Sequence, residues 1–183
     1  MKTIQIRKGR FLVNPFDEDI FVFIKYGWAI ETSDTDSKRA LDLLTPNSLG
    51  VLSYGNILLF ESDTILEIGD RKRLIDRFDF YFEKERRQQN LFSLRRCYRA
   101  ETAVAGFFLF ASEQSKQRFI YLTHKSIAKF VGMWKETVTR TLLEFRKKKF
   151  IAYNTSRNPN HLGCSCPIEL LNIPALKEKA NLL

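Results

Sequence analysis

Short runs of apolar residues alternate with turn-forming residues along the first seventy positions of the chain. The runs are rich in Val, Ile, Phe, Leu and Trp, and Asn-Pro, Gly or polar clusters separate them, as is typical of strands joined by turns. Gly27 lies inside the longest run and predicts a bulge or bend there. The predicted strands cover residues 10–14, 19–31, 39–44, 57–60 and 64–68. Strands at this spacing favour a small antiparallel barrel or sandwich over residues 1–70.

The hydrophobic spacing becomes helical after residue 70. No Pro or Gly occurs between Asp70 and Ala105, and apolar residues recur three to four positions apart from Leu74 onward. The pattern predicts a long helix over roughly 71–93 and a second helix over roughly 96–113. A long helix with a partial apolar stripe between two modules favours a dimer interface, and packing of that helix against its own barrel is the alternative.

A helix, a break and another helix are predicted between residues 122 and 147. The hydroxyl of Thr123 can cap the first helix, and Gly132 ends it at the position where a positive φ is easiest. Small and apolar residues then recur on one side of each helix, as two helices that cross closely require. These residues are Ile127, Ala128, Val131, Val138, Leu142 and Phe145. The pattern indicates a helix-turn-helix, in which the second helix enters the major groove of DNA.

The other side of the second helix carries polar groups that can read base edges. Arg140 can donate two hydrogen bonds to guanine, and Glu136 can accept one from cytosine. A carboxylate would be repelled by phosphates, so Glu136 favours base reading over simple adhesion. An ordinary helical hairpin with a charged solvent face is the alternative. The predicted base-reading residues are Lys135, Glu136, Thr139 and Arg140, and the predicted phosphate contacts are Thr123, Thr137 and Lys148.

The charge distribution indicates a polyanionic partner for the back of the chain. The formal net charge is +9, yet residues 1–70 hold seven Lys and Arg against eleven Asp and Glu, a net charge of −4. The remaining residues hold 23 basic and ten acidic side chains, a net charge of +13. This asymmetry is typical of a sensing or assembly module joined to a nucleic-acid module. Charge alone leaves a solvated basic surface as the alternative.

Secreted and membrane proteins are not expected. The first ten residues lack the apolar core of a signal peptide, and the longest apolar run, at 103–111, is shorter than the ~20 residues that cross a bilayer. Three cysteines are an odd count, unlike a secreted disulfide framework. The chain is therefore predicted to be soluble and intracellular.

Metal-dependent catalysis is not expected either. A barrel enzyme would need clustered ligands inside the barrel, and the only two histidines, His124 and His161, lie outside it. Cys164 and Cys166 have no second ligand pair nearby, so free thiols in a loop are favoured over half of a metal or redox site. We predict that the chain is not an enzyme.

Residues 122–151 resemble the helix-turn-helix of the CRP/FNR superfamily of bacterial transcription regulators. The stretch Lys-Glu-Thr-Val-Thr-Arg at 135–140 is similar to that family's recognition-helix signature. Four stretches resemble the NtcA-type nitrogen regulators of cyanobacteria and some plastids: Leu-Thr-His-Lys-Ser-Ile-Ala at 122–128, Thr-Val-Thr-Arg at 137–140, Arg-Lys-Lys-Lys at 146–149 and residues 44–53.

The resemblance implies an α+β fold with three parts. A shortened jelly roll of the cyclic-nucleotide-binding kind would cover 1–70, a dimerisation helix 71–95, and a winged helix-turn-helix 96–183. The wing strands would be 150–153 and 168–171, with 154–167 as the loop between them. The resemblance also implies a homodimer on a pseudo-palindromic site with recognition helices about 34 Å apart, RNA polymerase as a partner, and a location in the cytoplasm or a plastid stroma.

Four departures from the family pattern bear on the expected ligands and on the start of the second helix. The arginine expected after the stretch 50–53 is missing from 53–62, so cyclic nucleotide binding is not expected, and no iron–sulfur cluster is predicted because the N-terminal cysteines are absent. The possible effector is 2-oxoglutarate, at Gly50, Val51, Leu52 and Ser53. Glu136 matches the superfamily pattern but not the NtcA type. Trp134 replaces the small polar residue usual before the second helix, and it could pack against the wing or crowd the backbone. A winged-helix nucleic-acid or protein interaction module without base reading is the alternative function.

Overall fold

The structure is a computed structural model that describes residues 2–15, 18–33, 40–69, 79–153 and 167–180. The chain divides into two compact units, Met1–Asn90 and Leu91–Leu183. Helix α1 (Asp79–Arg95) continues across the boundary between them.

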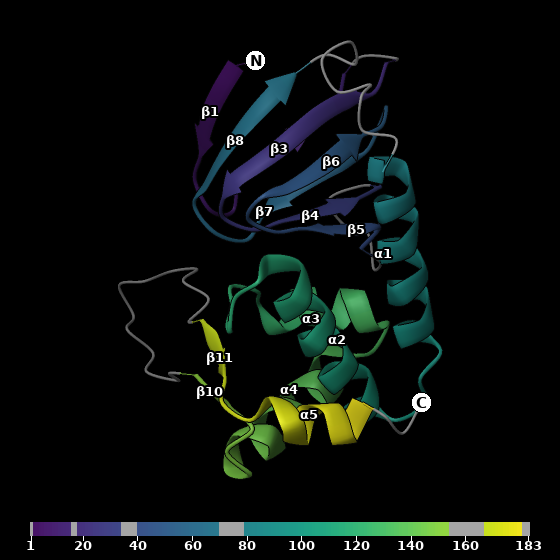
Figure 1. The fold of residues 1–183 in the computed structure, drawn as a ribbon, viewed down its shortest axis with the longest axis vertical. Coiled ribbons are helices and arrows are strands. Elements are labelled where there is room, and N and C mark those ends of the chain that lie inside the picture. Colours follow the sequence, from purple (N-terminus) through teal and green to yellow (C-terminus); the bar gives the residue numbers. More distant parts are fainter. Residues whose placement is uncertain (1, 16–17, 34–39, 70–78, 154–166, 181–183) are drawn as a thin grey trace. The chain divides into compact units, whose positions relative to one another are not determined.

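Two antiparallel four-stranded sheets form the first unit (Figure 1). The strand order is β1-β8-β3-β6 in one sheet and β2-β7-β4-β5 in the other. Buried side chains from both sheets, including Ile24, Leu66, Leu44 and Phe60, form a single apolar core between them. The strands are β1 (Lys2–Ile6), β2 (Phe11–Val13), β3 (Ile20–Tyr26), β4 (Ala29–Thr32), β5 (Asp42–Leu44), β6 (Ser48–Leu52), β7 (Ile57–Phe60) and β8 (Thr64–Gly69).

The longest predicted strand, 19–31, is two strands in different sheets. The bend expected at Gly27 divides β3 from β4, because Gly27 has a φ of +98° and a Cβ there would collide with Thr64. The sequence pattern missed β1 and β6 as strands. In β1 the apolar residues are only half-buried, since this strand lies at the edge of its sheet and pairs with β8 alone.

Buried ion pairs attach α1 to the first unit. The Arg87 guanidinium donates to both carboxylate oxygens of Asp42, at 3.2 and 2.9 Å, and both side chains are buried. The Lys84 ammonium lies 3.3 Å from a carboxylate oxygen of Glu31 and donates to the carbonyl of Val51 at 3.0 Å. Burial raises the pKa of Glu31, and the charge of Lys84 opposes that shift. Lys84 and Arg87 therefore hold this part of the helix on the sheets of the same chain, and the predicted dimer contact stays a prediction. The predicted segment 71–78 lies outside the described residues.

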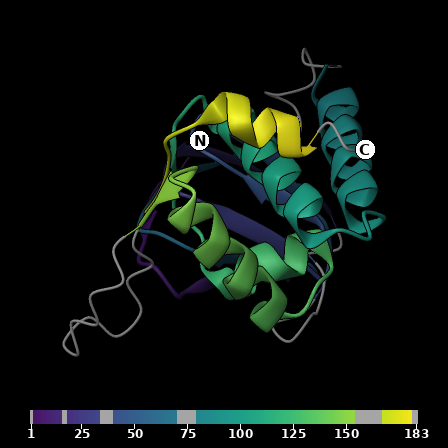
Figure 2. The same cartoon turned by 90° about the horizontal axis from the view of Figure 1, so that it is seen from below.

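The described residues of the second unit form four helices after α1 and a three-stranded sheet of order β10-β11-β9. Helix α5 lies against α2 (Figure 2), and aromatic side chains of α2, α3 and α4 fill the core. The elements are α2 (Ala100–Ser115), β9 (Phe119–Ile120), α3 (His124–Val131), α4 (Lys135–Lys147), β10 (Ile151–Ala152), β11 (Ile168–Leu170) and α5 (Ile173–Ala180). The arrangement confirms the predicted α+β class.

The predicted helix 96–113 is displaced, because α2 begins at Ala100 and ends at Ser115. The N–H groups of Arg96 and Cys97 bond to carbonyls three residues earlier, which makes a turn after α1. Arg99 then has an extended backbone, and Lys116 ends α2 in the left-handed region. The wing strands are also shorter than predicted, and 154–166 lies outside the described residues. No helix in the described part of the chain has the length and apolar character needed to cross a membrane.

Candidate nucleic-acid interface

Helix α3 begins and ends at the residues that the sequence predicts. The Thr123 hydroxyl accepts a hydrogen bond from the N–H of Ser126 at 3.1 Å and lies 2.6 Å from the Ser126 hydroxyl. Gly132 has a φ of +70°, and its N–H bonds to the carbonyl of Ala128. These contacts confirm the cap at Thr123 and the break at Gly132, so that α4 starts only three residues later.

Buried apolar side chains hold α3 and α4 together. Every residue predicted for the inward faces of the two helices is buried in the structure. Phe130 of α3 also stacks on Phe107 of α2, with ring centroids 5.1 Å apart. Arg95, in the last turn of α1, donates from Nε to the carbonyl of Phe130 at 3.0 Å. One side of α4 is therefore fixed by the core of the second unit, and its other side faces outward.

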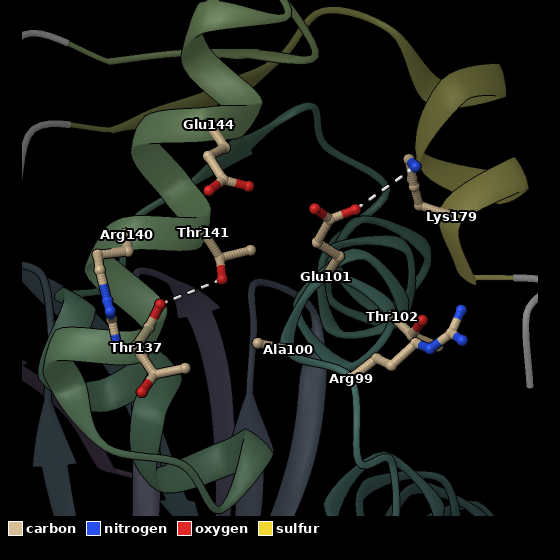
Figure 3. A pocket seen from close by; sticks show the side chains of 9 residues that line it. All are labelled: Arg99, Ala100, Glu101, Thr102, Thr137, Arg140, Thr141, Glu144 and Lys179. Atoms are coloured by element: carbon tan, nitrogen blue, oxygen red, sulfur yellow. Dashed lines mark hydrogen bonds and ion pairs between the residues drawn. The ribbon is translucent and has the colours of Figure 1, made fainter.

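Lys135, Glu136 and Arg140 are exposed on that outward side of α4. None of the three forms an ion pair with any residue in the described part of the chain. Their charged groups are therefore not neutralised by the residues that the structure describes. In Figure 3 the Arg140 side chain extends along α4 toward Thr137 and away from Glu101 and Glu144. This is the direction of the N-terminal end of α4, where Lys135 and Glu136 lie.

Thr139 has a different environment from the other predicted base-reading residues. It is half-buried, and its hydroxyl lies 3.1 Å from Nδ1 of His124. Burial lowers the pKa of His124, and the charge of Lys135 lowers it further. The His124 ring also meets the Tyr153 ring edge-on, with centroids 5.7 Å apart. A hydroxyl has one donor and two lone pairs, so this bond leaves Thr139 able to make another. No pattern in the sequence indicated that His124 belongs to this surface.

Thr137 and Arg140 line a hollow beside α4 with a volume of about 510 Å³ (Figure 3). The first turn of α2 forms the opposite wall, and the Glu101 carboxylate there pairs with Lys179 of α5 at 3.4 Å. Arg99 adds a further cation to the lining. Arg99 was not predicted for this site, although the three arginines at positions 95, 96 and 99 were a signal.

The basic residues 146–149 lie at the C-terminal end of α4, as expected. Lys148 and Lys149 are exposed, and Arg146 lies over the ring of Tyr153 at 5.2 Å. Cations are favourable at a helix C-terminus whether or not DNA is present. The exposed position of Lys148 is compatible with the predicted phosphate contact, which stays a prediction.

The residues predicted to hold an effector belong to the first unit. Gly50, Val51 and Leu52 are buried in β6, and Ser53 is half-buried. Leu52 belongs to the apolar core between the sheets, and a Cβ on Gly50 would collide with Leu44. Lys84 and Arg87 of α1 bring cations to this strand, and both are paired with internal carboxylates.

Trp134 does not pack against the described strands of the wing, because 78% of the residue is exposed.

No group of His, Cys, Asp and Glu among the described residues could hold a metal ion. Cys97 is a buried free thiol, and Cys164, Cys166 and His161 lie outside the described residues.

Residues 102–178 match the family described as the Crp-like helix-turn-helix domain. A CRP-family transcriptional regulator from Thermus thermophilus has a similar solved structure, with 15% identity, 99% of this chain and 97% of that chain covered, and a TM-score of 0.73. FixK2 from Bradyrhizobium japonicum shows 16% identity, 97% and 96% coverage, and a TM-score of 0.75. A CRP/FNR-family regulator, also from Thermus thermophilus, shows 20% identity, 98% coverage of both chains and a TM-score of 0.69. No match was found among curated proteins.

These findings show a CRP-like fold, with antiparallel sheets followed by helices and a C-terminal helix-turn-helix domain. The two Thermus thermophilus proteins are named as transcriptional regulators. The finer resemblance to NtcA-type regulators finds no support among them and stays a prediction.

Proposed function

We propose that the chain is a DNA-binding transcription regulator that reads a specific duplex sequence with α4. One observation carries the proposal: α4 is anchored on one side by a buried core, and its other side presents Lys135, Glu136 and Arg140, which form no ion pair with any described residue. The Crp-like match of residues 102–178 supports it independently. We assign no catalysis to the chain. A cytoplasmic location goes with the proposal, because a regulator acts where its DNA lies.

Base reading follows from the chemistry of the exposed face. The planar guanidinium of Arg140 suits O6 and N7 of a guanine, and the Glu136 carboxylate suits the N4 amino group of a cytosine one turn away along α4. Lys135 contributes a charge at the start of the helix, where a base or a phosphate is within reach. The hydroxyls of Thr123 and Thr137 and the Lys148 ammonium are proposed to contact phosphates, which fix orientation without carrying sequence information.

Selection of bound sites from random duplexes, followed by competition binding, tests the proposal. A regulator should prefer its selected duplex over random DNA by roughly a thousandfold or more. Equal binding to all duplexes would contradict base reading and favour the alternative, an adhesive winged-helix module. Complete absence of DNA binding would favour a protein interaction module.

The regulator is proposed to act as a homodimer on a pseudo-palindromic site, with RNA polymerase as a further partner. The exposed residues of the described part of α1 support an intermolecular contact, since Phe92 has more than half of its surface in solvent. Sedimentation at micromolar concentration, with and without the selected duplex, tests this part. A single copy in both states would remove the dimer from the proposal.

The first unit is proposed to act without an acidic effector at β6. A dicarboxylate such as 2-oxoglutarate needs unpaired cations, and the two cations that contact β6 within the described residues, Lys84 and Arg87, are paired with Glu31 and Asp42. Calorimetric titration of the full chain with 2-oxoglutarate, with and without the selected duplex, should give no heat of binding. Saturable binding that tightens DNA affinity would instead support the NtcA-type effector at residues 50–53.

A further inference from the structure

The two tryptophans of the chain have opposite environments. Trp28 is buried in the first unit with 1% of its surface exposed, whereas Trp134 in the second unit is 78% exposed. Trp134 makes no ring contact with any residue in the described part of the chain. The indole combines a large apolar surface with an N–H donor, so it is available to pack on a bound partner.

Trp134 also occupies the position at which a side chain normally caps a helix. It is the N-cap residue of α4, with an extended backbone at φ −67° and ψ 141°, and it forms no cap hydrogen bond. The indole N–H is a donor only, so it cannot accept from the free N–H groups of the first turn. The corresponding residue of α3, Thr123, does make that bond. A serine at 134 would therefore stabilise α4 better than the tryptophan does.

The position of Trp134 at the start of α4 indicates which part of a DNA duplex the indole can contact. It directly precedes Lys135 and Glu136, which are exposed at the start of the helix that we propose to enter the groove. In that docking mode the N-terminal residues of the helix approach the base edges. Trp134 directly precedes those residues, so in this docking mode it also lies at the end of the helix that approaches the bases. The apolar group that a base presents in the major groove is the C5-methyl of thymine.

We propose that Trp134 is a specificity-determining residue whose indole packs on the C5-methyl group of a thymine in the bound duplex. The inference rests on the proposed function, because it needs α4 in the major groove. It adds a base preference that Arg140 and Glu136 cannot supply, since their groups read guanine and cytosine through hydrogen bonds.

Intrinsic fluorescence tests whether DNA covers the indole. The signal of Trp134 is the difference between the full-length wild type and the Trp134→Phe variant, because Trp28 contributes equally to both. Saturation with the selected duplex should shift the Trp134 emission to shorter wavelength and reduce its quenching by acrylamide severalfold. Unchanged acrylamide quenching in the saturated complex would overturn the inference.

Replacement of single thymines by uracil, which lacks only the methyl group, tests the base preference. The wild type should lose about fourfold in affinity at one thymine of each half-site, the effect of exposing one buried methyl group. Trp134→Ser should bind the thymine and uracil duplexes at that position equally, while its melting temperature rises because the serine caps α4. Equal uracil losses in the wild type and the variant would overturn the reading of a methyl group by Trp134.

Tyr54→Ser is the matched control, because Tyr54 is an exposed aromatic residue of the first unit with 62% of its surface in solvent. It should keep the wild-type affinity and the wild-type uracil profile.

Different results would contradict the proposed function and the inference about Trp134. A wild type without preference for any duplex contradicts the proposed function, whereas a strong preference without a Trp134-dependent uracil effect contradicts only the inference about Trp134.

Discussion

Arg140 lies one helical turn from Glu136 on the exposed side of α4, and neither side chain is paired within the described residues. An unpaired guanidinium needs no internal bond to be broken before it binds a base. Its two parallel donors give directional discrimination that a lysine ammonium cannot reproduce. The proposed base-reading surface therefore consists of charged side chains that form no ion pair within the described residues.

Arg140→Ala should weaken binding to the selected duplex by about 1–3 kcal/mol and relax specificity at one base position. The reason is the loss of a bidentate contact to guanine. Competition binding against duplexes changed one base pair at a time measures both effects. Lys177→Ala, which removes an exposed cation of α5, is the control for net charge. Equal losses on selected and random DNA would contradict base reading by Arg140.

Lys148→Ala should lower the affinity for all duplexes alike. Each phosphate contact releases condensed counterions, so the slope of log affinity against log salt should flatten by about 0.9 when one contact is lost. Binding measured at several salt concentrations on selected and random DNA gives the slopes. An unchanged slope would show that Lys148 does not contact a phosphate.

His124 should make the stability of the second unit depend on pH. Its pKa is lowered in the folded chain, by burial and then by Lys135, so the neutral ring is favoured. Protons therefore bind more readily to the unfolded chain. The contribution to stability is complete above the unfolded pKa of about 6.5 and is lost as the pH falls through the folded value.

Denaturant unfolding of the full chain between pH 8 and 5 measures this dependence. His124→Asn keeps a polar group near Thr139 but removes the titration, so its free energy of unfolding should vary less with pH in this range. A wild type and variant with the same pH dependence would exclude His124 as the source.

The break between helices α3 and α4 depends on Gly132, whose backbone lies in the left-handed region. Gly132→Ala should destabilise the second unit by about 1–2 kcal/mol, because Gly132 has a φ of +70° and L-residues are disfavoured there. The new Cβ would also lie 3.3 Å from Cγ of Arg95. Gly55→Ala has a similar φ of +75° and no atom within 4 Å, so it isolates the backbone effect in the first unit. Thermal unfolding of both variants measures the difference, and a fully stable Gly132→Ala would contradict the argument.

The helix-turn-helix was the most predictable element because its ends depend on local chemistry. Thr123 and Gly132 act through bonds to residues three or four positions away, and such bonds follow from sequence spacing. The start of α2 was predicted four residues early, since the turn at 96–98 carries no Gly or Pro. The missed α5 had readable signals, because Asn172 caps it and Pro174 lies in its first turn.

Contacts between distant segments could not be predicted in the same way. The pairing of Arg87 with Asp42 joins residues 45 positions apart, and only the packing of α1 on the sheets brings them together. The stretch 50–53 was predicted to hold an effector, and the burial of Gly50, Val51 and Leu52 in β6 depends on strands that are distant in sequence. At the candidate site, the charges of α4 were evident from spacing, whereas the contact of His124 with Thr139 depends on how two helices cross.

In the whole molecule, acidic residues prevail at the front of the chain and basic residues at the back. The front of the chain, residues 1–70, has a net charge of −4 and the rest has +13, so only the back of the chain is attracted to DNA at long range. Helix α1 runs from the first unit into the second, where Arg95 bonds to the end of α3. In the proposed dimer, each copy would supply one α4 to the same duplex.

Such a dimer would bind two half-sites at a fixed separation. Five base pairs inserted between the half-sites of the selected duplex should reduce affinity to that of a single half-site, because they rotate one half-site by about half a helical turn of 10–10.5 base pairs. Fluorescence anisotropy on the original duplex, the lengthened duplex and an isolated half-site measures this. Five base pairs added outside the half-sites should change nothing, since the separation is kept. An affinity that does not depend on the spacer would show that the copies bind independently, and Lys135, Glu136 and Arg140 would then have to supply the whole specificity from one groove.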